Sequence, residues 1–437
     1  MKQAIACTNV FDLDLPGWHV LKHDRIDKDW HLVVETDRAA LVRCPECDGD
    51  DLYRRGSREH LYRDLPVYTN RVGLIIKRHR YSCRACGHLF YQPLPELDDK
   101  RHATKRLVEY VQQESLRRTF LHIAEETGLH EKTIRNIFRD FAADLSRTRP
   151  VIAPEILGID EVYIKRRYLC VFTDLQHKRI INMYEGQPEK KRNSPLSKTS
   201  VGGYLYELQD RRNVQVVCTD MSAAYRQAVR HLLPYAVLVI DRFHVQKLVD
   251  EAADKIRKKF SQSRSSSTQG KTVPGRKKDD ATIFKTPVYE LTVNDKLRME
   301  VWEHKYPLLL ETYYFKEKFH RMWMLTDRKR AEEKYREWRR SVPPHLAPIF
   351  KTVIETIDKW HKPIFAYFDH PEVTNSYTDM ANGLIKLANR IGRGYSFEML
   401  RAKMVHGASE RASERERPKG FKRRKSLPDT QAPNNKL

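Results

Sequence analysis

Residues 151–186 read VIAPEILGIDEVYIKRRYLCVFTDLQHKRIINMYEG, in which apolar runs alternate with short charged breaks. Runs of this length, rich in β-branched and aromatic residues, are typical of strands, and their short connections predict an antiparallel meander of three. The first run ends in Asp160. The pattern therefore predicts a carboxylate at the end of a buried strand, with the basic stretch 165–167 a few residues beyond it.

Helices and strands alternate in the segment that follows. A polar, basic loop over residues 187–200 leads to a helix predicted over residues 201–212. The strand in "VQVVCTDM" ends in Asp220, a helix follows, and the strand in "AVLVIDRFHV" ends in Asp241. Three strands followed by alternating helices and strands describe a ribonuclease-H-like α/β fold, whose fourth strand neighbours its first. Asp160 and Asp220 are therefore expected on adjacent strands.

Carboxylates on adjacent strands suit metal-dependent phosphodiester chemistry. Two Mg²⁺ ions about 3.5–4 Å apart can activate an attacking oxygen and stabilise a leaving one. Mg²⁺ prefers hard oxygen ligands and keeps several waters, so a few carboxylates suffice, with Mn²⁺ as a substitute. An aspartate at a strand end is otherwise an ordinary turn or cap residue. Two of them on neighbouring strands favour the metal site.

A third carboxylate is expected from a later helix, in "EVTNSYTDMANGLIKLANRIGRGYSFEMLRAKM" at residues 372–404. Asp379 lies in the first turns of this helix, and Asn382 follows on the same face. The alternative is a solvated polar face. The basic residues of this block that we expect to contact DNA are Lys386, Arg390 and Arg393.

A long insertion separates the two parts of this catalytic domain. After a basic amphipathic helix, residues 261–280 have the composition of a loop. Residues 287–363 are rich in Trp, Lys and Glu and predict helices, so the insertion is expected to be all-helical. Its tryptophans are expected to pack between helices rather than to stack on bases.

Four of the seven cysteines form two C-x-x-C pairs, Cys44 with Cys47 and Cys83 with Cys86. Two such pairs can present four thiolates tetrahedrally to one Zn²⁺ ion. With four thiolates no position stays open for water, so the zinc would be structural. The alternative is four unrelated thiols. The pairs and the strand-like run between them predict a zinc ribbon.

Residues 101–148 predict a helix-turn-helix domain. In "FLHIAEETGLHEKTIRNIFRDF", Gly128 falls in a short turn and Ile134 and Ile137 follow at helical spacing. Any helical hairpin with a turn glycine gives a similar pattern, but the neighbouring zinc ribbon favours DNA binding. The residues expected to face a DNA groove are Lys132, Arg135, Asn136 and Arg139.

The chain of 437 residues carries 81 Lys plus Arg against 58 Asp plus Glu, a formal charge of +23. Such an excess favours a polyanionic partner, here double-stranded DNA, over a merely basic surface. No run of 18 apolar residues predicts a membrane span, and "MKQAIACTNVFDLDLPGW" lacks the pattern of a signal peptide. We expect a cytoplasmic, nucleoid-associated protein with reduced cysteines.

The motifs "GIDEVYIKRRY", "CTDMSAAYRQAV", "VIDRFHVQK" and "TNSYTDMANGLIKLANRIGRGYSFEMLRAKM", in this order after the ribbon and the helix-turn-helix, resemble the ISL3 family of bacterial insertion-sequence transposases. The resemblance covers roughly residues 40 to 407. It implies a DDE transposase, which performs metal-dependent DNA cleavage and strand transfer at terminal inverted repeats.

The resemblance also implies the site residues. The two catalytic aspartates of the family fall on Asp160 and Asp220, and its glutamate falls on Asp379, which is shorter by one methylene. Asp241 and His244 lie near the site by the same resemblance. Glu372 and Glu398 flank the third position but miss it.

The leading hypothesis is therefore a DNA transposase acting as a homodimer on paired ends, with inverted repeats and target DNA as partners. One alternative is a catalytically weakened or domesticated transposase that acts as a DNA-binding regulator, which the aspartate at 379 favours. Another is a structure-selective nuclease of the same fold. The expected domains are an N-terminal segment (1–40), a zinc ribbon (41–95), a helix-turn-helix domain (101–148), a catalytic domain (152–260 and 370–407), a helical insertion (261–369) and a disordered basic tail (408–437).

Overall fold

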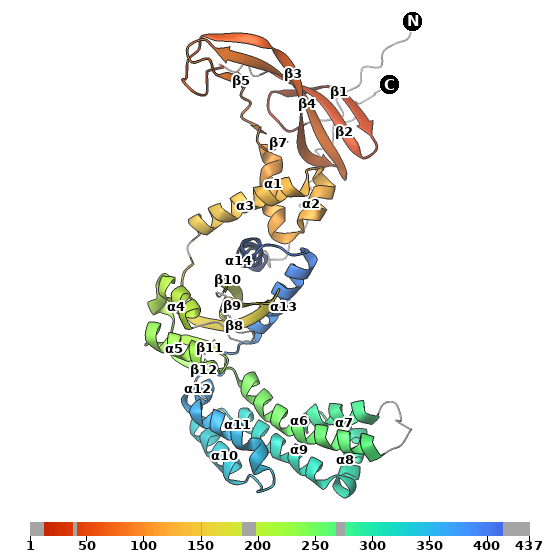
Figure 1. The fold of residues 1–437 in the computed structure, drawn as a ribbon, viewed down its shortest axis with the longest axis vertical. Helices are drawn as coiled ribbons and strands as arrows, with labels where there is room; N and C mark the ends of the chain where they lie inside the picture. Colours follow the sequence, from red (N-terminus) through yellow and green to blue (C-terminus); the bar gives the residue numbers. More distant parts are fainter. Residues whose placement is uncertain (1–12, 38–41, 150, 186–197, 268–275, 414–437) are drawn as a thin grey trace, which may run out of the picture. The chain divides into compact units, whose positions relative to one another are not determined.

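The chain divides into two compact units in the computed structural model (Figure 1). The first comprises residues 1–150 and 387–411, and the second comprises residues 151–386 and 412–437. No helix in the described part of the chain is long and apolar enough to cross a membrane. Most of the expected basic loop at 187–200 and the tail from 414 onward lie outside the described residues, which are 13–37, 42–149, 151–185, 198–267 and 276–413.

A seven-stranded sheet opens the first unit, in the order β1-β2-β4-β3-β7-β6, with β5 pairing with β4. Its core contains Leu32, Tyr62 and Leu74. The expected N-terminal segment contributes two of these strands, and β2 pairs in parallel with β4. The strands are β1 (Trp18–Ile26), β2 (Asp29–Thr36), β3 (Leu52–Val67), β4 (Asn70–Cys83), β5 (Leu89–Tyr91), β6 (Leu97–Asp98) and β7 (Ala103–Thr104).

Three helices follow the sheet: α1 (Lys105–Arg117), α2 (Phe120–Thr127) and α3 (Glu131–Thr148). Thr119 caps α2 through its side chain, and Gly128 ends it in the left-handed region at φ 72°. A residue with a Cβ would be strained there, which explains the glycine in the turn. The helix-turn-helix geometry expected from residues 101–148 therefore forms.

The helix α14 (Phe397–Ser413) packs within this first unit. The buried amine of Lys403 donates to the carbonyl oxygens of Ser115 and Arg118, the latter at 2.8 Å. It also lies 4.7 Å from the ring centre of Phe120. The helix continues to Ser413, so residues 408–413 are helical rather than disordered, because the ordered turns before them propagate the helix.

The second unit contains a five-stranded sheet in the order β10-β9-β8-β11-β12. The strands β8, β9 and β10 pair antiparallel, whereas β11 pairs in parallel with β8 and β12. Lys165 and Arg166 form the turn between β8 and β9 with φ of 50° and 65°. The strands are β8 (Ile156–Ile164), β9 (Arg167–Asp174), β10 (Arg179–Glu185), β11 (Val216–Thr219) and β12 (Val237–Ile240).

Two apolar cores lie on the two faces of this sheet. One contains Val217 together with residues of α4 (Lys198–Glu207) and α5 (Ala223–Leu232). The other contains Val216 and Cys218 together with residues of the helices that follow β12. Because side chains alternate along a strand, neighbouring residues of β11 enter opposite cores.

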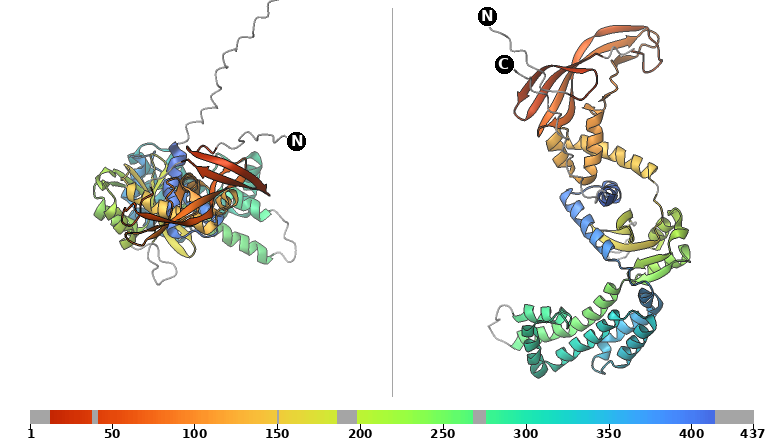
Figure 2. Two further views of the ribbon diagram at one scale, coloured as in Figure 1. Left: turned by 90° about the horizontal axis from the view of Figure 1, so that it is seen from above. Right: turned by 180° about the vertical axis from the view of Figure 1, so that it is seen from behind.

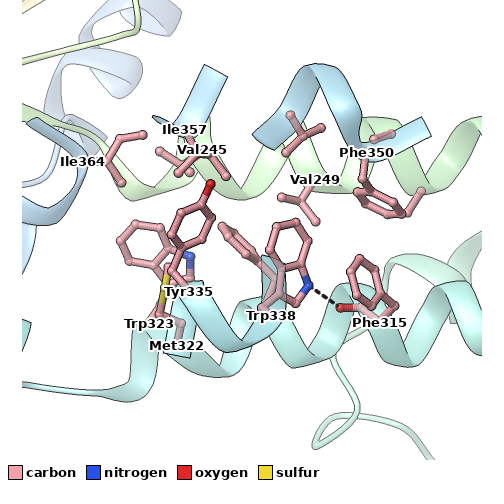
Figure 3. Close-up of a cluster of buried hydrophobic side chains, with 14 of the residues drawn as sticks. Val245, Val249, Phe315, Met322, Trp323, Tyr335, Trp338, Phe350, Ile357 and Ile364 are labelled. Atoms are coloured by element: carbon pink, nitrogen blue, oxygen red, sulfur yellow. Dashed lines mark hydrogen bonds between the residues drawn. The ribbon is translucent and has the colours of Figure 1, made fainter. Parts of the chain in front are cut away.

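The helices after β12 form a large helical body (Figures 1 and 2). Trp302, Trp323, Trp338 and Trp360 are all buried in it, which confirms that these tryptophans pack between helices. Figure 3 shows Trp338 donating from Nε1 to the carbonyl oxygen of Phe315 at 3.1 Å. The helices of this body are α6 (Arg242–Ser267), α7 (Arg276–Lys285), α8 (Val293–Lys305), α9 (Pro307–His320), α10 (Arg328–Arg340), α11 (Ala347–Lys359) and α12 (His361–Phe365). The helix that follows it, α13 (Ser376–Ile391), lies beside the sheet instead.

The prediction of a loop over residues 261–280 is partly wrong, because both ends of this range are helical. The helix α6 runs through Ser267, and α7 begins at Arg276. Serine has a low helix propensity, but a long helix already formed over residues 242–260 extends one residue at a time without a new nucleation cost. Residues 268–275 lie outside the described part.

Candidate functional site

Asp160 and Asp220 lie at the same level of neighbouring strands. In the parallel pair, Val216 is opposite Ile156 and Cys218 is opposite Gly158. Extending this register by two residues brings Asp220, which directly follows β11, level with Asp160. The expectation that Asp160 ends its strand is wrong, because β8 continues to Ile164 through the hairpin with β9.

The helix α13 packs against this sheet at a glycine. Thr378 of α13 and Thr173 of β9 share a buried hydrogen bond of 2.7 Å between their hydroxyl groups. A Cβ at Gly158 would lie 2.7 Å from Thr378 Oγ1 and closer still to Thr173 Oγ1. Gly158 and Asp160 face the same side of β8, so this contact brings α13 to the side of the sheet that carries Asp160. A lone glycine in an apolar strand is the signal that could have predicted it.

Asp379 and Asn382 come from the first turns of α13. Asn382 Nδ2 donates to Asp160 Oδ2 at 2.7 Å, so the two expected site residues are in direct contact. Asn382 is buried, whereas Asp379 is exposed, as is Lys386 on the same helix. The three expected aspartates therefore lie around the middle of β8 and the end of β11, with Asp379 on the solvent side.

The pKa values of the three aspartates are raised, which means that their charged forms are disfavoured. Burial raises the pKa of Asp160 to about 6, and the nearby Asp220 and Asp379 carboxylates add to this shift. Burial also raises the pKa of Asp220, and partial removal from water raises the pKa of Asp379. Such clustered carboxylates with raised pKa values are typical of cation-binding sites, because a bound cation relieves the repulsion.

Asp241 and His244 border this cluster. Asp241 directly follows β12, and its amide donates to the carbonyl oxygen of Thr219 at 3.3 Å. His244 Nδ1 lies 3.6 Å from Asp241 Oδ2, and this carboxylate raises the pKa of His244. His244 in turn opposes the upward pKa shifts of Asp220 and Asp379. A protonated His244 is therefore a positive charge beside the three aspartates.

The donor set fits a hard divalent cation. Carboxylates predominate, and the buried Oδ1 of Asn382 has no hydrogen-bond partner among the described residues, which leaves an oxygen free to ligate. The three aspartates do not bring their oxygens within 4.8 Å of one another as the cysteines do with their sulfur atoms. A site for two cations does not require that spacing, since ions about 3.5–4 Å apart share ligands across a wider site.

The four cysteines of the expected zinc ribbon lie together. Their sulfur atoms are all within 4.8 Å of one another, and Cys44 and Cys86 approach to 3.5 Å, as do Cys47 and Cys83. Tetrahedral bonds of about 2.3 Å to zinc place sulfur atoms about 3.8 Å apart. The geometry and the donor set fit one structural Zn²⁺ ion.

The two cysteine turns have the same backbone hydrogen bonds. Cys44 accepts from the amide of Asp48 and donates to the carbonyl of Gly49, both at 2.9 Å. Cys83 accepts from Gly87 at 3.0 Å and donates to the carbonyl of His88 at 2.9 Å. A backbone amide of Cys86 lowers the pKa of Cys83 to about 7, which favours the thiolate that binds metal.

The predicted groove-facing residues of α3 differ in exposure. Lys132 and Arg139 are exposed, whereas Arg135 and Asn136 are half-buried. Arg135 donates to Glu131 at 2.6 Å, and its guanidinium carbon lies 5.4 Å from the ring centre of Phe120. Arg135 is thus engaged within its own unit, which leaves the two exposed cations for an external partner.

The last turn of α13 and the turn after it carry the two arginines that the sequence predicts to contact DNA. Arg390 and Arg393 are both exposed, and Arg393 has a φ of 50° in the turn before α14. Tyr395 anchors this turn, with its ring centre 5.0 Å from that of Phe120. Lys386 belongs to the second unit, whereas both arginines belong to the first. Glu398 is on α14 of the first unit, and the exposed Glu372 lies 3.9 Å from His370.

Comparison with known proteins gives matches along most of the chain. Residues 157–404 match the DDE-type transposase model of family ISL3, and residues 92–142 match the helix-turn-helix domain of that family. Residues 40–86 match the zinc-finger of the transposases IS204, IS1001, IS1096 and IS1165. A curated relative, the transposase for insertion sequence element IS1001 of Bordetella parapertussis, is 21% identical over 367 residues, which cover 82% of this chain and 86% of the relative.

Proposed function

This chain belongs to the ISL3 family of transposases, and we propose that it binds the terminal inverted repeats of an insertion sequence and cleaves and joins DNA there. The observation that carries the proposal is the level placement of Asp160 and Asp220 on neighbouring strands, with α13 bringing Asn382 into contact with Asp160. A helix-turn-helix domain of the same family supports DNA as the partner.

We infer that the second unit has a ribonuclease-H-like fold. The order β10-β9-β8-β11-β12, with three antiparallel strands followed by two parallel ones, supports this assignment. In such a sheet the first and fourth strands are neighbours, as β8 and β11 are here. The helices from α6 to α12 then interrupt the fold between its fifth strand and α13.

The residues proposed to act are Asp160, Asp220 and Asp379. Two Mg²⁺ or Mn²⁺ ions, when bound, supply activation of the attacking oxygen and stabilisation of the leaving one. The aspartates would hold these ions, and Asn382 orients Asp160 through its hydrogen bond. His244, with its raised pKa, would offer a proton or a positive charge to a phosphate oxygen. In cleavage, water would attack the phosphorus and displace the 3′-oxygen, which leaves as a free hydroxyl. In joining, that 3′-hydroxyl would attack a phosphorus of the target DNA and displace a 3′-oxygen there.

The DNA-binding role falls to the first unit. Lys132 and Arg139 are exposed on α3 and would enter a groove of the inverted repeat. Arg390 and Arg393 are exposed on residues 387–411, the second segment of this unit, and would contact the DNA backbone. Because two element ends must be joined, we propose that a homodimer acts on paired ends, which sedimentation of the protein with and without repeat DNA would test.

Cleavage of a labelled inverted-repeat end in Mg²⁺ tests the proposal. Asp160→Asn and Asp220→Asn should abolish cleavage while binding of the same DNA is retained. Lys255→Asn, which removes a charge outside the cluster on α6, serves as a matched control and should leave the rate unchanged. Robust cleavage by either aspartate variant would contradict the assignment.

Variants of Asp379 distinguish an active transposase from a DNA-binding regulator that no longer cleaves DNA. It is exposed and one methylene shorter than the glutamate of the family, a misplacement that can cost catalysis about 100-fold. If Asp379 acts, Asp379→Ala abolishes cleavage. A weak wild type whose rate rises in Asp379→Glu would favour the DNA-binding regulator. If neither change alters a robust rate, Asp379 is not part of the site.

A further inference from the structure

A groove lies on the helical body beside the carboxylate cluster. It has a volume of about 610 Å³ and is lined by the first turns of α6, the segment after α7, the end of α9 and the short helix that follows it. Figure 1 labels α6 and α9, the two helices that contribute most of the lining residues. None of the residues assigned above to catalysis or zinc binding lines it.

The floor of the groove is a network of ion pairs. Lys316 is buried, donates to the carbonyl oxygen of Phe284 at 3.0 Å and lies 3.1 Å from Glu317. His320 contacts Asp250 at 2.9 Å. Glu317 also accepts from the amide of Val288 at 2.9 Å. Lys316 balances one of the two carboxylates, Glu317 and Asp250, so with a neutral His320 the floor carries a single negative charge.

The rim of the groove is positive. Arg242, Lys285 and Arg321 line it and have no carboxylate partner among the described residues. Lys247 adds a fourth cation. Its Nζ lies 4.0 Å from Glu251 Oε1, which makes a long, exposed ion pair. These four cations outnumber the single negative charge of the floor and form a site for an anion with several separated charges, such as consecutive phosphates of a nucleic acid strand.

Aromatic side chains stand exposed on the same groove. Phe243 is 68% exposed and Tyr289 is 67% exposed, an unusual state for large apolar rings. Trp323, which is nine-tenths buried and also lines the groove, has an indole Nε1 with no hydrogen-bond partner among the described residues. A buried donor without a partner is uncommon in folded proteins.

We propose that this groove holds an unpaired nucleotide stretch of the DNA strand next to the reacting phosphodiester, with its bases stacked on Phe243 and Tyr289. Exposed rings with surrounding cations are the chemistry of single-strand binding. A duplex keeps its bases stacked inside and offers no base face to such rings. The proposal rests on the proposed function and assigns the helical body a part in it.

Continuity with the carboxylate cluster supports this position. Phe243 lies between Arg242, which lines the groove, and His244, which borders the aspartates. Lys247 of the groove also acts electrostatically on Asp379. A strand leaving the aspartates along the first turns of α6 therefore enters the groove directly.

The test uses the full chain and a labelled oligodeoxythymidine of about 12 nucleotides, with an abasic strand of equal length as the base-free probe. Phe243→Leu and Tyr289→Leu should each weaken oligodeoxythymidine binding by about 5- to 100-fold and leave abasic binding unchanged. Tyr235→Leu, at a ring that is 81% exposed outside the groove, is the matched control and should change neither.

Three outcomes overturn the proposal: unchanged oligodeoxythymidine binding in both groove variants, an equal loss with the abasic strand, or an equal loss with a blunt duplex. Asp160→Asn separates this inference from the proposed function. If it abolishes cleavage while the groove variants bind like the wild type, the function stands and the groove assignment fails. If no preparation cleaves but the groove variants lose base-dependent binding, the groove stands and the function fails.

Discussion

Asn382 Nδ2 lies 2.7 Å from Asp160 Oδ2, joining residues 222 positions apart in the chain. This hydrogen bond fixes the orientation of the Asp160 carboxylate. We expect Asn382→Ala to lower the rate of Mg²⁺-dependent cleavage by about 10- to 100-fold, as loss of a ligand-orienting partner does. Raising the Mg²⁺ concentration should restore part of the rate. A rate equal to that of the wild type at low Mg²⁺ would contradict the orienting role.

Asp160 predicts a pH-dependent stability. Its folded pKa of about 6 exceeds its usual 3.8, so the folded state binds the proton more tightly. Without metal, the stability contributed by Asp160 falls as the pH rises from 3.8 to about 6. Above about pH 6, the full cost of burying the charged carboxylate lowers the free energy of unfolding. Asp160→Asn should therefore raise the free energy of unfolding at pH 7.5 by on the order of 1–3 kcal/mol, but not at pH 3.5.

Urea unfolding at the two pH values measures this difference. Mg²⁺ should stabilise the wild type at pH 7.5 and should stabilise Asp160→Asn less, because the cation needs the charged carboxylate. Equal stabilisation of both proteins by Mg²⁺ would show that Asp160 is not a ligand.

Gly158 predicts a steric limit under α13. Gly158→Ala places a methyl group 2.7 Å from Thr378 Oγ1, so we expect a loss of about 1–3 kcal/mol in the free energy of unfolding. Cleavage should also fall, since α13 carries Asn382. Thr173→Ala in the same chain should recover part of the stability by removing the nearest atom.

A matched control for Gly158 lies in α4. A Cβ at Gly203 would meet nothing within 4 Å, and alanine has the better helix propensity. Gly203→Ala should therefore leave the protein as stable as the wild type or more so. Equal destabilisation by both substitutions would contradict the steric argument at Gly158.

Lys403 predicts a dependence of DNA binding on α14. Lys403→Met keeps the apolar contacts with Phe120 but leaves the carbonyl oxygens of Ser115 and Arg118 without their donor, at a cost of about 1–3 kcal/mol for each. We expect the first unit to melt at a lower temperature and repeat-DNA affinity to fall above that temperature. Lys105→Met, at an exposed lysine of α1, should change neither in calorimetry or gel-shift assays.

Exposure on α3 predicts unequal effects of two arginines. The side chain of Arg139 is 64% exposed. If it reads a base, Arg139→Ala should weaken the binding of repeat DNA by about 1–3 kcal/mol. Arg135→Ala should lower the melting temperature more and the affinity less, because Arg135 bonds Glu131. Titrations with repeat DNA and random DNA decide this: equal losses on both DNAs would assign Arg139 to phosphate contact.

The sequence predicted the elements that local patterns encode. The two C-x-x-C pairs, the glycine that ends α2 and the strands that carry Asp160 and Asp220 follow from spacing and periodicity over short stretches. The charged residues that follow Asp160 favour a strand end at this position. However, β8 runs on to Ile164, and Lys165 and Arg166 form a tight hairpin turn before β9.

Contacts between distant segments were not predicted. Nothing in residues 397–411 indicates that α14 completes the first unit, since its recognition depends on carbonyl groups of Ser115 and Arg118, which every residue possesses. The contact of Gly158 with Thr378 likewise depends on two positions that only the folded sheet brings together. The groove needs four separate elements, so no single stretch of sequence contains its pattern.

The discontinuous first unit has a consequence for synthesis. A ribosome releases residues 1–150 long before it makes residues 387–411, and domains otherwise fold as they emerge. Phe120 and Phe138 contact Lys403, so their packing is complete only after almost the whole chain has been synthesised. A nascent or truncated chain therefore lacks the finished helix-turn-helix unit, and full DNA binding belongs only to molecules that already carry the complete set of aspartates.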